Sequence, residues 1–137
     1  MLPLRYARRW QIASLFVLAF VLAAALMPVF WFLDDKAGVL SWFARNDKWV
    51  HGFTFLTLSI WFTGLFHKKS YWQIGIGLLF FGLIIEACQR LVIYRTADWA
   101  DVGANTAGII LGLAIGAGGL GGWCLRAEER LIKYNSD

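Results

Sequence analysis

Four apolar stretches, each long enough to cross the hydrocarbon core of a bilayer, dominate this sequence. They cover residues 12–33, 49–66, 71–94 and 102–125, and about 20 apolar residues suffice for one helical span. Lipid offers no partner for backbone hydrogen bonds, so such stretches form helices. With 59% hydrophobic residues and a mean hydropathy of +0.59, the chain is too apolar for a soluble domain. We therefore expect an all-α membrane protein, a four-helix transmembrane bundle that forms one domain over residues 1–137.

Basic residues predict the orientation of the four spans. Eight of the 13 lysines and arginines fall at one end of the predicted bundle: Arg5, Arg8, Arg9, Lys68, Lys69, Arg126, Arg130 and Lys133. By the positive-inside rule this end is cytoplasmic, and so are both termini. Topology then explains the net charge of +4, and no nucleic-acid partner is implied. A signal peptide cleaved near Ala25 is an alternative, but the first stretch exceeds the usual signal-peptide core of about 7–15 residues.

The loop between the first two spans mixes apolar and polar side chains. Within residues 34–48, Trp42 and Phe43 follow two aliphatic residues among polar neighbours. This pattern is typical of a short helix that lies on the membrane surface. We expect such an interfacial segment at the outer face.

Span 4 carries glycine at every fourth position, at Gly108, Gly112 and Gly116. Small residues at this spacing line one helix face and let a second helix backbone approach closely. The second helix is either another span of the same chain or, as an alternative, span 4 of a second copy, which would give a homodimer. The glycine run over residues 116–122 predicts a loosely held end of span 4, because ordering glycine costs more backbone entropy.

Polar side chains gather at the end of the predicted bundle opposite the basic end. They are Asp47, Lys48, His51, Glu86, Gln89, Arg90, Arg95, Asp98, Asp101 and Asn105. Charged groups near membrane depth cost about 2.5–3.5 kcal/mol each, so they persist where they face a protein interior or a wet cavity. Asp47 and His51 are four residues apart and share a helix face. Asp101 and Asn105 have the same spacing, on the face of the glycine stripe. The sequence predicts one shared polar site at the outer face.

Simpler roles exist for most of these side chains. Asp47, Asp98 and Asp101 are suited to cap helix N-termini, and Lys48 can extend toward lipid headgroups. Such roles would describe an inert polar bundle. Glu86 fits this alternative poorly, because about two helical turns separate it from the outer end of span 3, and a carboxylate at that depth needs a partner.

Three sequence blocks carry a resemblance to a known family. They are Asp47-Lys48-Trp49-Val50-His51, Glu86-Ala87-Cys88-Gln89, and the block from Arg95 through Asp98 and Asp101 to Asn105 and Gly108. In this order and spacing they resemble the VanZ-like family of small bacterial membrane proteins, named for a member linked to low-level teicoplanin resistance. The resemblance covers spans 2 to 4. It implies a multi-pass protein of the bacterial cytoplasmic membrane with a role in the cell envelope, but it supplies no reaction.

We expect the outer site to bind an anionic or polar headgroup, of a lipid or a lipid-linked envelope precursor, and to act on it. The expected substrate-binding residues are Arg95, Gln89, Asp98, Asp101, Asn105 and Lys48. Arg95 would hold a phosphate or carboxylate. If a reaction follows, His51 and Glu86 are the expected acid and base, with Asp47 orienting His51.

Two alternatives stay open. One is a non-enzymatic binding or accessory module for envelope biogenesis. The other adds a divalent metal ion, held by nitrogen and oxygen ligands from His51, Glu86, Asp98 and Asp101. No recognised metal motif is present, so no cofactor is predicted. Ion transport is disfavoured, because the cytoplasmic halves of the spans lack ionisable residues that could continue a path.

Overall fold

The computed structural model describes residues 1–26, 36–91 and 99–134, with the side chains of residues 36–45 left out of the description. Within these residues the chain forms helices and no strand, which confirms the all-α prediction. The elements are α1 (Ala7–Leu26), α2 (Lys36–Leu65), a 3-10 turn η2 (Lys68–Ser70), α3 (Tyr71–Arg90), α4 (Trp99–Ile115), a π-helical turn η3 (Gly116–Leu120) and α5 (Trp123–Tyr134).

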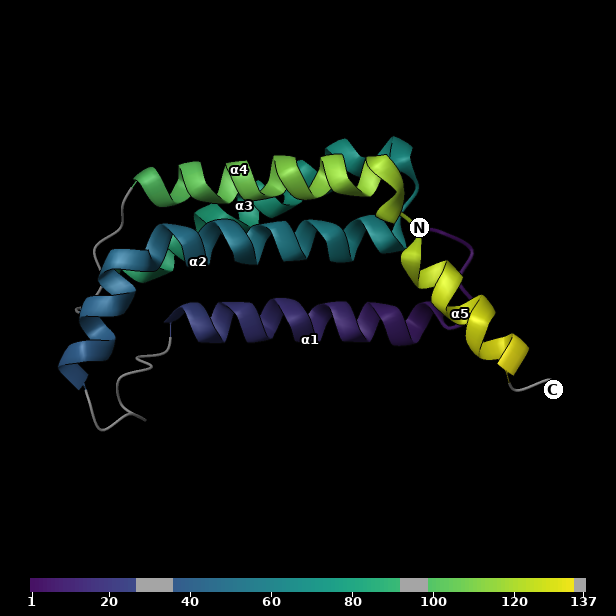
Figure 1. Ribbon diagram of the computed structural model, residues 1–137, viewed down its shortest axis with the longest axis horizontal. Coiled ribbons are helices and arrows are strands. Elements are labelled where there is room, and N and C mark those ends of the chain that lie inside the picture. The colour runs from purple at the N-terminus through teal and green to yellow at the C-terminus, as the bar shows by residue number, and fades with distance from the viewer. Residues whose placement is uncertain (27–35, 92–98, 135–137) are drawn as a thin grey trace.

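Helices α1 to α4 run side by side, and each reverses the direction of the one before (Figure 1). The most extensive packing is between α2 and α4, and α3 packs on both of them and on α1. Their shared core includes Phe55, Leu58, Leu78, Ile85 and Ile109. One end of the bundle gathers the chain's N-terminal residues, the end of α2 and α5, while the other gathers the end of α3 and the start of α4 (Figure 1).

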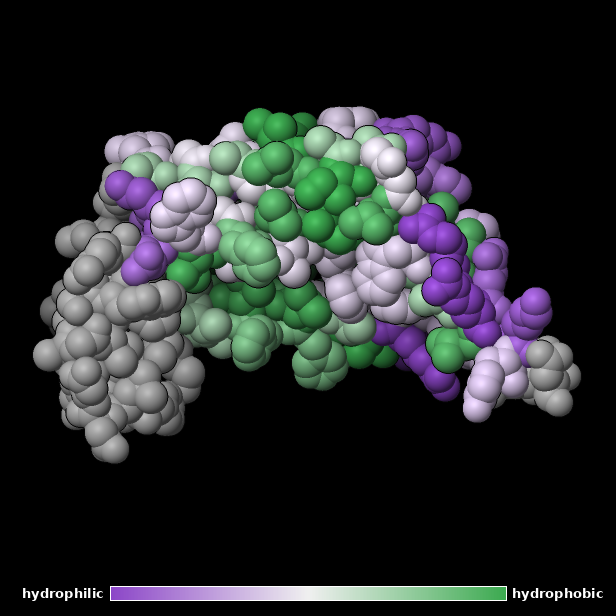
Figure 2. Space-filling model, viewed as in Figure 1, coloured by the Kyte–Doolittle hydropathy of each residue, from purple (hydrophilic) through white to green (hydrophobic). Residues whose placement is uncertain are grey.

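Three helical segments are long and apolar enough to cross a membrane: Ala7–Leu26, Lys68–Arg90 and Trp99–Leu120. They support the prediction of a membrane protein. Figure 2 shows hydrophobic side chains over the middle of the bundle and hydrophilic ones toward its two ends. α2 is less apolar because its buried face carries polar residues, among them His51, Ser59 and Thr63. Those side chains point into the bundle, where neighbouring helices shield them.

The segment before span 2 differs from its prediction. Instead of a separate surface helix within residues 34–48, a single helix runs from Lys36 to Leu65. No proline or other helix breaker lies between the two predicted segments, so nothing ends the helix there. Figure 1 shows that the first turns of α2 point away from the axis of the rest. Asp47 therefore lies inside a helix and does not cap one. Residues 27–33 of the predicted first span lie outside the described residues.

The predicted fourth span, residues 102–125, falls on two helices. α4 ends at Ile115, the chain turns through η3, and α5 begins at Trp123. Gly119 has φ 147° and Gly122 has φ 72°, backbone conformations that side chains with a Cβ rarely adopt. These two glycines let the chain change direction between the helices.

Arg126 holds this glycine turn closed. Its guanidinium donates hydrogen bonds to the carbonyl oxygens of Gly121 at 2.9 Å, Leu120 at 3.1 Å and Gly119 at 3.2 Å. The backbone N–H of Gly122 donates to the carbonyl of Thr63 on α2 at 3.0 Å. The guanidinium of Arg126 thus satisfies carbonyls that the turn exposes, while the loosely held end expected from the glycine run stays a prediction.

The glycine stripe of α4 faces α2 of the same chain. A Cβ on Gly108 would collide with the carbonyl oxygen of Gly52, and one on Gly112 would lie 2.7 Å from that of Leu56. Gly116 faces the side chain of Thr63 in the same way. A homodimer through these glycines would first have to displace α2.

At the other end of the chain, Glu128 on α5 caps α1. Its carboxylate accepts hydrogen bonds from the backbone N–H groups of Arg5 (2.7 Å) and Tyr6 (3.1 Å) and from the indole N–H of Trp10 (2.8 Å). Backbone N–H groups at a helix start have no partner within the helix, and the helix dipole favours a negative charge there.

Burial and the nearby Glu128 raise the pKa of the Cys124 thiol to about 12, so that thiol stays neutral.

The contact between α2 and α4 predicts a large difference between two glycine substitutions on the same helix. Gly108→Ala should lower the free energy of unfolding by about 1–3 kcal/mol, because the helices must separate to admit the methyl group. Gly103 has open space around the position of a Cβ, so Gly103→Ala should leave stability unchanged or raise it by up to about 1 kcal/mol. Unfolding in detergent measures both, and equal stabilities would contradict the close contact.

The Glu128 cap predicts a second effect on stability. Glu128→Ala leaves three donors without their acceptor, and we expect a loss of about 1–3 kcal/mol. The matched control is Glu129→Ala at the next position, where the side chain is exposed and the effect should be small. Thermal unfolding in detergent compares the two. Limited proteolysis should also cut α5 faster only in Glu128→Ala, and equal cutting in both would argue against the cap.

Candidate functional site

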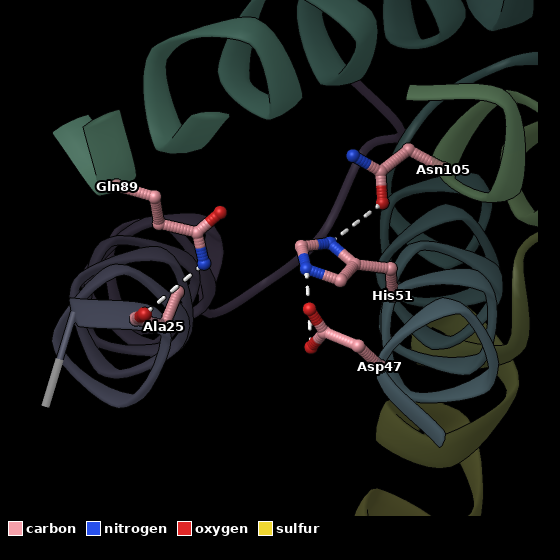
Figure 3. Close-up of polar contacts among 5 residues, drawn as sticks. All are labelled: Ala25, Asp47, His51, Gln89 and Asn105. Atoms are coloured by element: carbon pink, nitrogen blue, oxygen red, sulfur yellow. Dashed lines mark hydrogen bonds and ion pairs between the residues drawn. The ribbon is translucent and has the colours of Figure 1, made fainter. Parts of the chain in front are cut away.

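Helix α2 presents Asp47 and His51 one turn apart, at the end of the bundle opposite α5. The His51 side chain is 7% exposed, and its Nε2 lies 3.7 Å from Oδ1 of Asp47. Its Nδ1 lies 3.1 Å from Oδ1 of Asn105 on α4. Figure 3 shows the ring between these two partners. The contact with Asn105 is a hydrogen bond, whereas the distance to Asp47 is that of an ion pair.

Helix α4 adds Asp101 to this group. Asp101 is 3% exposed and Asn105 2%, and both lie on the face that packs against α2. One carboxylate oxygen of Asp47, one of Asp101 and one ring nitrogen of His51 all lie within 4.8 Å of one another. α4 begins at Trp99, so Asp101 is in the first turn rather than at the cap position that one simpler explanation assigned to it. Its carboxylate also benefits from the positive end of the helix dipole.

The two oxygen atoms that face the ring of His51 restrict where its protons can be. A neutral imidazole has one N–H group and one lone pair. If Nδ1 donates its hydrogen bond to the oxygen of Asn105, the other ring nitrogen, Nε2, turns its lone pair toward Asp47.

Helix α3 supplies Gln89 and Glu86. The side-chain N–H of Gln89 donates to the carbonyl oxygen of Ala25 at 3.2 Å, which satisfies one of the last carbonyls of α1. Figure 3 shows the side-chain oxygen of Gln89 pointing toward the space in front of His51. Glu86 is 4% exposed and lies one turn after Gly82, which packs against Asn105. The two residues therefore face the interior, as their spacing predicts.

A cleft of about 240 Å³ lies between α1 and α2 beside this group. Asp47, His51 and Thr54 are its polar lining. The remaining lining residues are apolar: Phe20, Val21, Ala24, Ala25, Val50, Phe55 and Ile85. Phe20 is also 73% exposed on the outside of α1, so the cleft reaches the apolar flank of the bundle. The cleft is thus apolar along most of its wall and polar at one end.

The predicted site residues divide into three groups. The structure brings together Asp47, His51, Asp101 and Asn105. Gln89 lies across the cleft from them and Glu86 is buried on the same helix, whereas Lys48 is exposed and does not line the cleft. The expected residues Arg95 and Asp98 lie outside the described residues.

Sequence reasoning missed the contribution of α1. Its residues form one wall of the cleft, but they are alanine, valine and phenylalanine. These residues are common on any membrane helix, so they do not indicate a binding site. The small residues Ala24 and Ala25 are the only signal of a space beside α1 in the sequence, and that signal also fits a cleavage site.

Comparison with known proteins adds no assignment. The chain matches no family model, no curated protein and no solved structure. The geometry of the site is therefore the main basis for a proposed function.

Proposed function

We propose that α1 to α4 form a four-span bundle in the bacterial cytoplasmic membrane, with both termini on the cytoplasmic side. Three helical segments have the required length and hydropathy, and α2 runs beside them (Figure 1). The basic residues support this orientation, because Arg5, Lys68 and Arg126 belong to the end that holds α5 and the positive-inside rule makes that end cytoplasmic. The site around His51 is then extracytoplasmic.

The function that we propose is binding of an amphiphile at this site. Its polar headgroup would contact Asp47 and His51, and its apolar part would lie along α1. The observation that carries the proposal is the cleft itself, which has an apolar wall, a polar end and a border on the apolar flank of the bundle. Ligand sites typically combine apolar lining with a few placed polar groups. A volume of about 240 Å³ suits part of a lipid, with the rest remaining in the bilayer.

We propose an anionic or polar envelope lipid, or a lipid-linked envelope precursor, as the amphiphile. The resemblance of three sequence blocks to the VanZ-like family supports this choice, because that family is named for a member linked to teicoplanin resistance. Gln89, Asn105 and Asp101 would contribute hydrogen bonds near the headgroup. Arg95, Lys48 and Asp98 complete the proposed binding set on the basis of the sequence alone.

Chemistry on the bound headgroup is the second part of the proposal. His51 and Glu86 are the candidates for proton transfer, and Asp47 orients the ring of His51 at 3.7 Å. The alternative is a non-enzymatic module that binds the same amphiphile or assists an envelope protein. The two differ in whether a buried carboxylate must accept a proton, so Glu86 distinguishes them.

The cleft predicts that filling it prevents lipid binding. We expect Ala24→Trp, which places an indole in the cleft, to reduce retention of the lipid at least about tenfold. The matched control is Ala23→Trp, at a neighbouring exposed position that does not line the cleft. Native mass spectrometry of the purified protein, incubated with phosphatidylglycerol or separately with an isoprenoid phosphate, measures retention. Equal retention by both variants would exclude the cleft as the binding site.

The buried carboxylate predicts a separate result. Glu86→Gln keeps the size and hydrogen bonding of the side chain but removes its charge. We expect it to retain the lipid in the same assay and to lose the envelope phenotype, measured as glycopeptide tolerance of cells that depend on this chain. Glu129→Gln is the control that should keep both. A full phenotype with Glu86→Gln would favour the non-enzymatic module.

A further inference from the structure

The group formed by Asp47, His51 and Asp101, which the proposed function places beside the headgroup, also has the composition of a metal site. It combines two carboxylates with one imidazole, and the ligand-type atoms lie within 4.8 Å of one another. Ligands that share one metal ion at about 2.0–2.4 Å are separated by no more than about twice that distance. The three side chains therefore fit around one ion with small adjustments.

The hydrogen bond of His51 supplies an independent observation. A metal-bound histidine almost always donates its other ring N–H to an oxygen atom, which fixes the tautomer and aims the free nitrogen at the metal. Here Nδ1 lies 3.1 Å from Oδ1 of Asn105, and Nε2 points to the carboxylate of Asp47. Asn105 belongs to neither the acidic pair nor the imidazole, yet it holds the ring as a metal ligand is held.

The negative charge of the two aspartates also favours a bound cation. Asp101 and His51 are buried, and two carboxylates close together in a medium of low dielectric constant repel strongly. A divalent cation between the two carboxylates would reduce this repulsion. Asp47 is 26% exposed and lines the cleft, so an ion has a route to the group.

We propose that Asp47, His51 and Asp101 bind one divalent cation of the zinc or manganese type, through a carboxylate oxygen of each aspartate and Nε2 of His51. One imidazole and two carboxylates suit such ions. This set replaces Glu86 and Asp98 of the sequence-based alternative with Asp47. Cation binding needs no amphiphile, so this proposal can be tested independently of the function proposed above. It would also leave Glu86 outside the set of metal ligands.

The test uses the full chain, purified in detergent, stripped with a chelator and then dialysed against Zn²⁺ or Mn²⁺ alone. We expect mass spectrometry of the metal content to find one ion per chain in the parent protein and in Glu129→Gln. Asp101→Asn should bind at least about tenfold more weakly by titration calorimetry. Asp47→Asn, at a more exposed position, gives the same comparison if Asp101→Asn does not fold. No bound ion in the parent protein, or equal affinity in these variants, would overturn the proposal.

Substitutions of Asn105 distinguish a metal site from a polar core that binds no metal. Asn105→Asp keeps an oxygen for Nδ1, so it should retain the metal, whereas Asn105→Leu should weaken binding about 10- to 100-fold. Substitution with Co²⁺ gives a second measurement, since its visible spectrum reports nitrogen and oxygen ligands directly. Retention of the same spectrum in His51→Gln would show that the imidazole is not a ligand and would contradict the proposal.

Discussion

The close contact between α2 and α4 is the constraint on which the rest of the structure depends. Gly108 lies against the backbone at Gly52, and Gly52 directly follows His51. This close approach of the two backbones is therefore next to the position where Asn105 reaches His51. A wider spacing between the helices would break that hydrogen bond and separate Asp101 from Asp47. The glycines of α4 thus determine the geometry of the site without contributing a side chain to it.

The sequence predicted the part of the site that follows from helix periodicity. Asp47 with His51, and Asp101 with Asn105, share faces at a spacing of four residues, and the structure places the four together. The role of Gln89 could not be predicted in the same way, because its partner is a backbone carbonyl of α1, and any residue type provides one. The turn before α5 was missed for a related reason: a glycine run allows several backbone paths, and only the contacts of Arg126 and Thr63 select one.

The two ends of the bundle treat buried charge differently. Glu128 is surrounded by three hydrogen-bond donors, which compensate the cost of burying its carboxylate. These hydrogen bonds stabilise the fold. Around His51, oxygen atoms of Asn105 and Asp47 face the two ring nitrogens and the carboxylate of Asp101 lies nearby. This set of groups suits the divalent cation proposed above.

Helix α1 is held unequally along its length, and this has a dynamic consequence. Its N-terminal half is joined to the bundle by Glu128 and by the hydrogen bond from Trp61 to Ser14, while its C-terminal half borders the cleft and meets Gln89 at its last turn. A tilt of α1 would pivot at the firmly held end and widen the cleft at the other. Breaking the hydrogen bond of Gln89 costs about 0.5–1.5 kcal/mol, and Val21, Leu22 and Ala25 of this half also pack against the core. The rate at which a lipid exchanges with the bilayer would then depend on the rocking of one peripheral helix, on the microsecond to millisecond timescale of such motions, and not on unfolding of the core.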